Sequence, residues 1–335
     1  MMIQEITTTG QRMGAHLRTL SIAALLSLTV AACAPMGHVT QPTFESGQYT
    51  FTTPTQAVAK LKTALESDDT AELARIFGPQ SGDLISSGDD VADSQSFKAF
   101  AARMNDKVEI VEKVNQNPVL KNQRLTFVYV GERGYPFPIA LHKRANGWRF
   151  DTAVGKEEII NRRIGRNEIR AIEAINRIVG AQRSFFEGHV SEGRTPQYAS
   201  RLFSSPGKRD GLYWERGQGQ PESPLAAAIA RASSDGYTLD GLKNRQTYYG
   251  YHFDILEKQG PKARGGAMSF LDDKGRMTKG FSVLAYPAKF GESGVMTFVA
   301  GPDGMIYQKN LGPNTDSLAR KMTAINPDLS WIPVR

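Results

Sequence analysis

The longest helical pattern of the chain, and the one that decides its fold, is Gly155-Lys-Glu-Glu-Ile-Ile-Asn-Arg-Arg-Ile-Gly-Arg-Asn-Glu-Ile-Arg-Ala-Ile-Glu-Ala-Ile-Asn-Arg-Ile-Val-Gly-Ala-Gln-Arg-Ser-Phe-Phe-Glu187. Apolar residues recur in it at three- and four-residue steps, at Ile160, Ile164, Ile172, Ile175, Val179 and Phe186. Such spacing places apolar side chains on one face of a helix. That face must be covered by another element, so we expect a core helix over residues 155–187.

Gln182 falls on the apolar stripe of this helix, between Val179 and Phe186. A side-chain amide at a buried position needs a hydrogen-bond partner. Two interpretations follow. The amide bonds to a neighbouring strand or loop, which is the commoner use of buried amides, or it contacts a ligand.

Helical and strand-like patterns divide the rest of the chain into two parts, residues 51–154 and 155–335. The first part opens with a helical pattern that begins at Pro54 and is stopped by Asp68-Asp69, a second short one through Leu73 and Phe77, and a third near residues 94–104. Strand-like runs follow at residues 108–110, 125–130, 138–141 and 148–150. Helices followed by antiparallel strands predict an α+β layer.

The second part repeats this order of helix and strands. After the long helix, strand-like runs lie at residues 249–255, 281–285, 295–299 and 305–307, and a last helix fits residues 314–325. The sequence therefore predicts an α+β protein, with helices and an antiparallel sheet first and a long helix packed on a second antiparallel sheet afterwards.

Residues 1–33 have the organisation of an export signal. Basic residues precede an apolar run, Leu20–Ala32, that is too short to span a bilayer. The run ends Val30-Ala-Ala-Cys33, which resembles the lipobox of bacterial lipoproteins, where the cysteine is acylated and becomes the first residue of the mature chain. The alternatives are a plain secretory signal, or a leader cut after Ala32 without acylation.

Either cleavage predicts a protein outside the cytoplasm, with Met1 or Met13 as its start. Ala34, rather than Asp, resembles the sorting position of lipoproteins of the outer membrane, so we expect a lipid-anchored envelope protein facing the periplasm. Residues 34–50 lack periodicity and form the expected tether. Cys33 is the one cysteine of the chain, and its use as an anchor excludes disulfides, thiolate catalysis and cysteine metal sites.

The charge of the chain is mildly positive, with 41 Lys and Arg against 34 Asp and Glu and a formal net charge of +7. Acidic residues alternate with the basic ones, and no block of lysine or arginine stands out. Together with export, this pattern argues against nucleic-acid binding.

An aperiodic segment rich in Gly, Pro and Ser, residues 204–224, separates the long helix from the second set of strands. Loops of this length are uncommon unless they are functional or flexible, so this loop is the principal candidate site. Tyr213, Trp214 and Asp210 are its expected ligand- or partner-binding residues, because aromatic rings outside a regular element are not explained by burial.

Ser205-Pro-Gly-Lys208 in this loop has the Ser-x-x-Lys spacing of penicillin-recognising enzymes. Gly207 opposes the helix that this chemistry uses, and no convincing Lys-Thr-Gly partner follows. A plain turn is the competing interpretation. Spacings typical of nucleophile elbows, zinc proteases and P-loops are absent from the sequence.

An acidic loop, with Asp83, Asp89, Asp90 and Asp93, is the one candidate for a cation site. Asp93 is first of all the expected cap of the helix near residues 94–104, and the other three suit turns. We therefore expect no metal and no cofactor.

Long runs of the chain resemble the bacterial exported family of unknown function numbered twenty-nine-fifty. They are Trp148-Arg-Phe-Asp151, Asn161-Arg-Arg-Ile-Gly-Arg-Asn-Glu168, Ser205-Pro-Gly-Lys-Arg-Asp-Gly-Leu-Tyr-Trp214 and Gly291-Glu-Ser-Gly-Val-Met-Thr-Phe298. The resemblance covers nearly all of the mature chain and implies no activity. An Asp/Gly-rich, calcium-like loop typical of the family is replaced here by residues 187–197, whose oxygen ligands are too few for calcium.

A fainter similarity connects the second part with the soluble domain of type IV pilins and pseudopilins. It rests on Asn167-Glu168 and Ala181-Gln182 in the helix, and on Gly250-Tyr251 and the Gly-x-x-Thr-Phe298 strand. The apolar half of a pilin helix is missing, since charged residues precede Asn167. The similarity implies a pilin-like domain used off the membrane, which favours binding or assembly over catalysis.

These observations favour a non-catalytic binding or assembly factor of the cell envelope, with an envelope protein or a glycan as its partner. The alternative is a hydrolase or transferase that acts on cell-wall or glycan material through Ser205 and Lys208.

Overall fold

The computed structural model describes residues 47–114 and 124–334. Its first part contains four helices and five strands: α1 (Pro54–Glu66), α2 (Thr70–Phe77), α3 (Gly82–Ile85), α4 (Asp90–Asp106), β1 (Val108–Val114), β2 (Arg124–Val130), β3 (Tyr135–Pro136), β4 (Leu141–Arg144) and β5 (Gly147–Phe150). Cys33, the rest of the expected export signal and residues 34–46 of the tether lie outside the described residues. Residues 48–50 do not belong to a tether as predicted, because the side chain of Gln48 donates to the carbonyls of Ile76 and Phe150 and the N–H of Tyr49 donates to the carbonyl of Arg75.

Side-chain caps set the starts of α1, α2 and α4. Thr53 accepts a hydrogen bond from the backbone N–H of Gln56, with Pro54 in the first turn of α1, and Asp69 caps α2. The third expected helix begins earlier than residue 94, because Asp89 accepts from the N–H of Ala92 and caps α4. The expectation that Asp93 is the cap was therefore wrong.

The first sheet is antiparallel, in the order β1-β2-β4-β5, with β3 paired to β2. Helices α1, α2 and α4 share a hydrophobic core with it, in which Leu61, Ile76, Leu141 and Phe150 are fully or almost fully buried. The run expected at residues 138–141 enters the sheet only at Leu141.

Helix α5 (Thr152–Ser191) is the predicted core helix, extended at both ends. Its buried stripe runs through Ala171, Ile175, Ile178 and Phe185, whereas Ile172 and Phe186 are half-buried at its edge. The apolar face is thus rotated slightly from the predicted one, because Ala171 and Ala181 bring the helix close to the second sheet and belong to the core.

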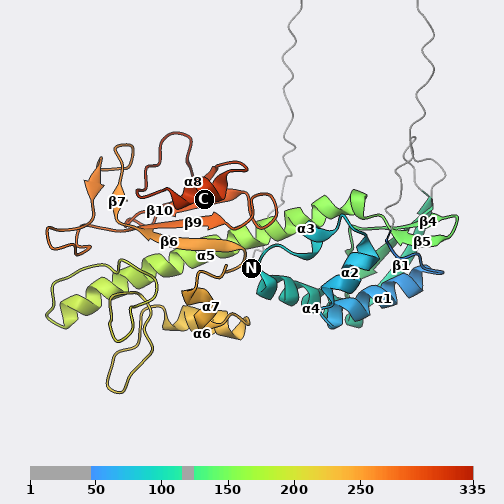
Figure 1. Cartoon of the computed structure of the whole chain (residues 1–335), viewed down its shortest axis with the longest axis horizontal. Helices are drawn as coiled ribbons and strands as arrows, with labels where there is room; N and C mark the ends of the chain where they lie inside the picture. The colour runs from blue at the N-terminus through green and yellow to red at the C-terminus, as the bar shows by residue number, and fades with distance from the viewer. Residues whose placement is uncertain (1–46, 115–123, 335) are drawn as a thin grey trace, which may run out of the picture. The chain divides into compact units, whose positions relative to one another are not determined.

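The second part contains α6 (Ala226–Ser234), α7 (Leu239–Lys243), β6 (Tyr251–Leu256), β7 (Lys258–Gln259), β8 (Met268–Ser269), β9 (Ser282–Pro287), β10 (Met296–Ala300), β11 (Ile306–Asn310), α8 (Thr315–Arg320) and β12 (Ile332–Pro333). An antiparallel sheet has the order β12-β11-β10-β9-β6, and β7 and β8 form a separate ribbon. Figure 1 shows α5 running between this sheet on one side and α6 and α7 on the other.

The α+β class predicted from the sequence is confirmed, with an antiparallel sheet in each part. Three short helices, α3, α6 and α7, were not predicted. The last helix ends at Arg320, before the expected residue 325, because Ile325 exchanges backbone hydrogen bonds with Lys258 and Gly260.

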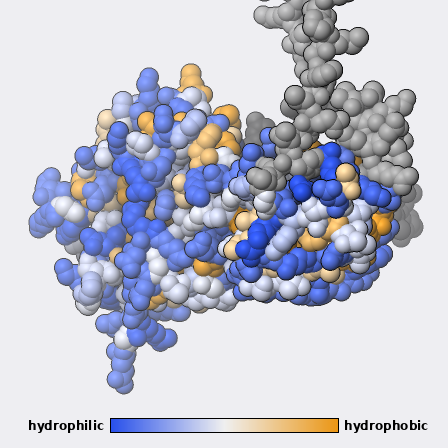
Figure 2. Space-filling model, turned by 45° about the vertical axis from the view of Figure 1, so that its right-hand side comes forward, coloured by the Kyte–Doolittle hydropathy of each residue, from blue (hydrophilic) through white to orange (hydrophobic). Residues whose placement is uncertain are grey.

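Charged and polar residues cover most of the face drawn in Figure 2, and apolar residues come through only in small groups. Within the part of the chain that the structure describes, no helix has the length and apolar composition to cross a membrane.

Candidate functional site

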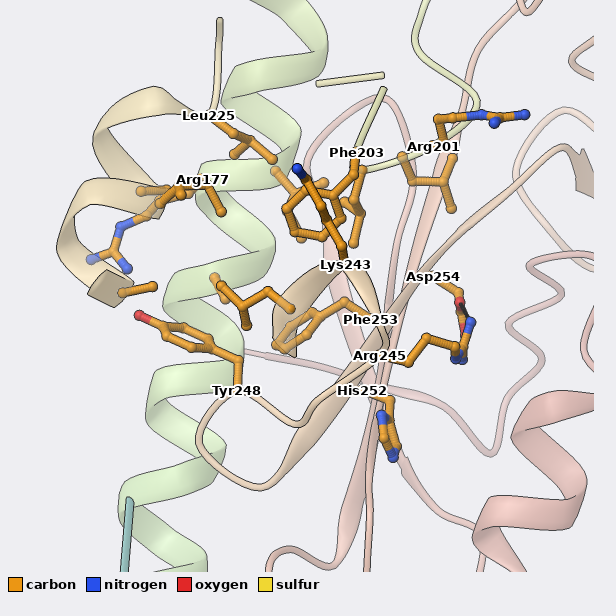
Figure 3. A pocket seen from close by; sticks show the side chains of 18 of the residues that line it. Arg177, Arg201, Phe203, Leu225, Lys243, Arg245, Tyr248, His252, Phe253 and Asp254 are labelled. Atoms are coloured by element: carbon orange, nitrogen blue, oxygen red, sulfur yellow. Dashed lines mark hydrogen bonds and ion pairs between the residues drawn. The ribbon is translucent and has the colours of Figure 1, made fainter. Parts of the chain in front are cut away.

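The candidate site is a pocket of about 410 Å³ between α5, α6, α7, β6 and residues 200–203. This volume lies within the range of small-ligand and side-chain pockets, about 300–1,000 Å³. Figure 3 shows side chains from the long helix, the short helices and the first strand of the second sheet converging on it.

The walls of the pocket are largely apolar. Ile178 comes from α5, Ala228 and Ile229 come from α6, and Phe203 and Phe253 come from the loop and from β6. Helix α6 forms here because Leu225-Ala-Ala-Ala-Ile-Ala230 is rich in alanine, and its apolar side packs against α5. The pocket is therefore an open extension of the second hydrophobic core.

Each of the four cations at the pocket has a carboxylate partner. The pairs are Arg177 with Glu173 (3.6 Å), Arg201 with Asp210 (3.9 Å), Lys243 with Glu215 (2.8 Å) and Arg245 with Asp254 (2.8 Å). The rim thus alternates in sign and leaves the pocket without an uncompensated positive charge. Such a site suits an apolar group better than an anion.

One end of the pocket is held rigidly by Arg245. Its guanidinium bonds both oxygens of Asp254, at 2.8 and 3.0 Å, and the hydroxyl of Tyr286 at 3.2 Å. A bidentate pair of this geometry fixes both side chains. Burial, followed by the charge of Arg245, lowers the pKa of the neighbouring His252, so its imidazole is neutral at pH 7.

Ser205 and Lys208 are the first and last residues of a tight turn, in which the N–H of Lys208 donates to the carbonyl of Ser205 at 2.9 Å. Pro206 and Gly207, with φ of +73°, occupy its centre. The hydroxyl of Ser205 donates to Asp210 at 2.9 Å and accepts from Arg201. Lys208 is exposed. Residues 205–208 therefore form a turn.

Tyr213 and Trp214 lie beside the pocket and do not line it. Tyr213 packs edge-on against Phe203, with ring centroids 6.1 Å apart, and thereby supports one wall. Trp214 packs edge-on against Phe185, and its indole N–H donates to the carbonyl of Pro221 at 3.0 Å. Both rings are half-buried against the core, which explains their presence in the loop.

Gln182 is fully buried and engaged with one residue. Its amide nitrogen donates to the carbonyl of Ala199, its oxygen accepts from the N–H of Ala199, and both distances are 2.8 Å. These two hydrogen bonds hold the segment around Ala199 against α5. Its polar atoms are used by the backbone, and it does not line the pocket.

Three carboxylates of the acidic loop, those of Asp83, Asp89 and Asp93, are engaged by other groups of the protein. Asp83 pairs with Lys156 at 2.9 Å, Asp89 caps α4, and Asp93 accepts from the N–H of Ser87 at 2.7 Å. Across residues 47–114 and 124–334, no three His, Cys, Asp or Glu side chains gather in a way that could hold a metal ion.

Sequence reasoning found the loop beside the pocket but missed the pocket, because α6 and α7 were not predicted. The alanine-rich run at residues 226–230 was the available signal for α6.

The fold and the site define a two-part α+β protein with an apolar, charge-balanced pocket. The model of the family described as protein of unknown function (DUF2950) matches residues 48–334, and the chain belongs to that family. No curated protein and no solved structure matches the chain. The similarity to pilins therefore has no support from a solved structure.

Proposed function

We propose that the protein is a non-catalytic binding factor of the bacterial cell envelope, whose pocket between α5, α6, α7 and β6 receives an apolar side chain or short apolar segment of an envelope protein. The observation that supports this is the combination of apolar walls with a rim of compensated ion pairs. An apolar centre within a polar rim is the composition of protein–protein interfaces.

A protein partner is favoured over a glycan. Sugar recognition uses aromatic faces together with free hydrogen-bonding groups, but Tyr213 and Trp214 pack on the core and the charged groups at the pocket are already paired. Catalysis by Ser205 and Lys208 gains no support from the turn that contains them.

The anchor and the location belong to the same proposal. Acylation of Cys33 would place the protein on the outer membrane, facing the periplasm, with residues 34–46 as a tether. Metabolic labelling with palmitate and membrane fractionation of Cys33→Ser test this part: loss of label and release from the membrane are expected, and an unchanged distribution would contradict it.

The pocket is tested by filling it from α6. Ala228 lines the pocket, whereas Ala230 lies on the exposed side of the same helix. Ala228→Trp should abolish cross-linking to a stoichiometric protein partner in intact cells, and Ala230→Trp should retain it. Equal capture by both variants would refute the proposed pocket.

A second comparison separates binding from catalysis. Ser205→Ala and Lys208→Ala should retain partner capture and complement a deletion strain, because neither side chain contributes to the pocket. Loss of complementation with retained capture would instead indicate a reaction at Ser205.

A further inference from the structure

A second pocket, of about 630 Å³, lies in the first part of the protein. It is bounded by α1, α2, α4, residues 135–138 and the first half of α5. Its walls are formed by side chains such as Leu61, Leu73, Phe100, Phe137 and Ile159. It is larger than the pocket beside α6 and is continuous with the other hydrophobic core.

Four arginines, Arg103, Arg162, Arg163 and Arg166, line this second pocket. Arg162 is paired with Glu158 at 2.7 Å. Arg163 is buried and donates to the backbone carbonyls of Asp83 and Leu84. Among the residues that the structure describes, Arg103, Arg163 and Arg166 form no ion pair.

The positions of these cations place their charges together. The guanidinium of Arg103 lies 5.4 Å from the centre of the Tyr135 ring, and that of Arg162 lies 5.9 Å from the same ring. Although part of Arg166 is exposed, the protein atoms around it lower its pKa, and the charges of Arg163, Arg103 and Arg162 lower it further. The four positive charges therefore lie close enough together to act on one another.

One carboxylate, that of Asp93, lines the pocket, and it accepts a hydrogen bond from the N–H of Ser87. Glu158 compensates Arg162 and the charge of Asp93 acts on Arg163, so Arg103 and Arg166 remain as an excess of positive charge beside apolar walls. The pocket beside α6 has the opposite character, since all its cations are compensated there.

We propose that this second pocket binds an anionic amphiphile, with a carboxylate or phosphate headgroup at Arg103 and Arg166 and an alkyl chain among the leucine and phenylalanine side chains. Arginine donates paired hydrogen bonds that match both headgroups. An apolar chain replaces water along the walls. This inference is independent of the protein partner proposed above.

Chain length gives a quantitative expectation. Each methylene that enters an apolar environment contributes enough to change affinity about fourfold. Affinity should therefore rise steeply from decanoate to dodecanoate and tetradecanoate.

The experiment is titration calorimetry of the purified full-length protein with these three carboxylates below their micelle concentrations, and with dodecanol and dodecyl phosphate. Saturable binding of one chain per protein is expected, with dodecanol at least tenfold weaker than the charged ligands, because hydrogen bonds to charged groups are the strong ones. Inorganic phosphate alone should not bind. The order of dodecanoate and dodecyl phosphate then tells which headgroup is preferred, and tighter binding of either one than of dodecanol supports the proposal.

Two pairs of variants locate the site. Gly165 and Gly180 are both interior glycines of α5 with open space where a Cβ would stand, but only Gly165 lines the pocket. Gly165→Trp should abolish binding and Gly180→Trp should not. Arg166→Gln should weaken binding of the anionic ligands about tenfold or more and leave the affinity for dodecanol unchanged. Arg183→Gln, 17 residues and about 25 Å further along the helix, should leave both affinities unchanged.

Circular dichroism of each variant reports whether it is folded, and the exposed Arg166→Gln keeps the test valid should the Trp variant lose structure. Equal affinity for dodecanol and dodecanoate, or unchanged affinity in a folded Gly165→Trp variant, would overturn the proposal. Neither result bears on protein capture through Ala228.

Discussion

Replacing Asp89 by Ala tests how the loop before α4 is joined to the second part of the chain. Asp89 is 2% exposed. One carboxylate oxygen accepts from the N–H of Ala92, and the other accepts from the hydroxyl of Tyr237 at 3.0 Å and from the N–H of Gly250 at 2.8 Å. Gly250 is 161 residues away in sequence.

The magnitude follows from these bonds. Loss of the cap costs about 1 kcal/mol. The hydroxyl of Tyr237 and the N–H of Gly250 are left without an acceptor in a buried site, at about 1–3 kcal/mol each. Burial raises the pKa of Asp89, so removal of the charge returns part of this cost. We therefore expect Asp89→Ala to lower the free energy of unfolding by about 2–4 kcal/mol.

The assay is urea unfolding followed by tryptophan fluorescence, with two control variants. Asp69→Ala removes the equivalent cap from α2 at an exposed position and should cost about 1 kcal/mol. Asp90→Asn removes the neighbouring exposed carboxylate and should change stability by no more than about 0.5 kcal/mol. If Asp89→Ala costs no more than Asp69→Ala, the links to Tyr237 and Gly250 contribute nothing and the reasoning is refuted.

Three further predictions concern α5 and an acidic side chain of α2. Gly155→Ala should destabilise the protein by about 1–3 kcal/mol in thermal unfolding, because its Cβ would lie 2.3 Å from the backbone carbonyl oxygen of Pro138. Gly180→Ala should stabilise it by up to about 1 kcal/mol, because a Cβ there stands in open space and alanine favours the helix. Gln182→Met should lower the free energy of unfolding in urea by about 2–4 kcal/mol, because the buried N–H and C=O of Ala199 lose their hydrogen-bond partner. Unchanged stability would show that water replaces the amide. Hydrogen bonds from two cations lower the pKa of Glu72 from 4.5 to about 2, so the native protein binds fewer protons than the unfolded chain in this interval and loses stability as the pH falls through it. Glu72→Gln should flatten that acid limb in a pH series of unfolding curves, and an unchanged slope would assign the acid sensitivity to other groups.

The elements found by sequence reasoning are those with local causes. Pro54 and the stripe of α1 predicted that helix to the residue at its start, and the alternating strands at residues 125–130 and 295–299 lie within one residue of β2 and β10. The cap of α4 was misplaced because Asp89 and Asp93 both suit a cap, and the choice depends on Ser87, whose N–H engages Asp93.

The candidate residues show the same limit. Gln182 was recognised as needing a partner because a polar residue on an apolar stripe is a local anomaly, but only the fold identifies Ala199 as that partner. Tyr213 and Trp214 are predicted binding residues because no periodicity explains them, and binding by either ring stays a prediction. Their burial comes from contacts with Phe203 and Phe185, which no local pattern encodes.

The sequence by itself determined the α+β class, the long helix and its polar interruption, because hydrophobic periodicity, caps and glycine positions act over a few residues. The tertiary structure alone decided where the pockets lie and which charges are compensated. Arg245 meets Asp254 while Arg103 and Arg166, 63 positions apart in the chain, line one pocket without a carboxylate partner among the described residues. Charge pairing and cavity shape depend on side chains brought together from distant segments, and packing, not local propensity, sets those distances.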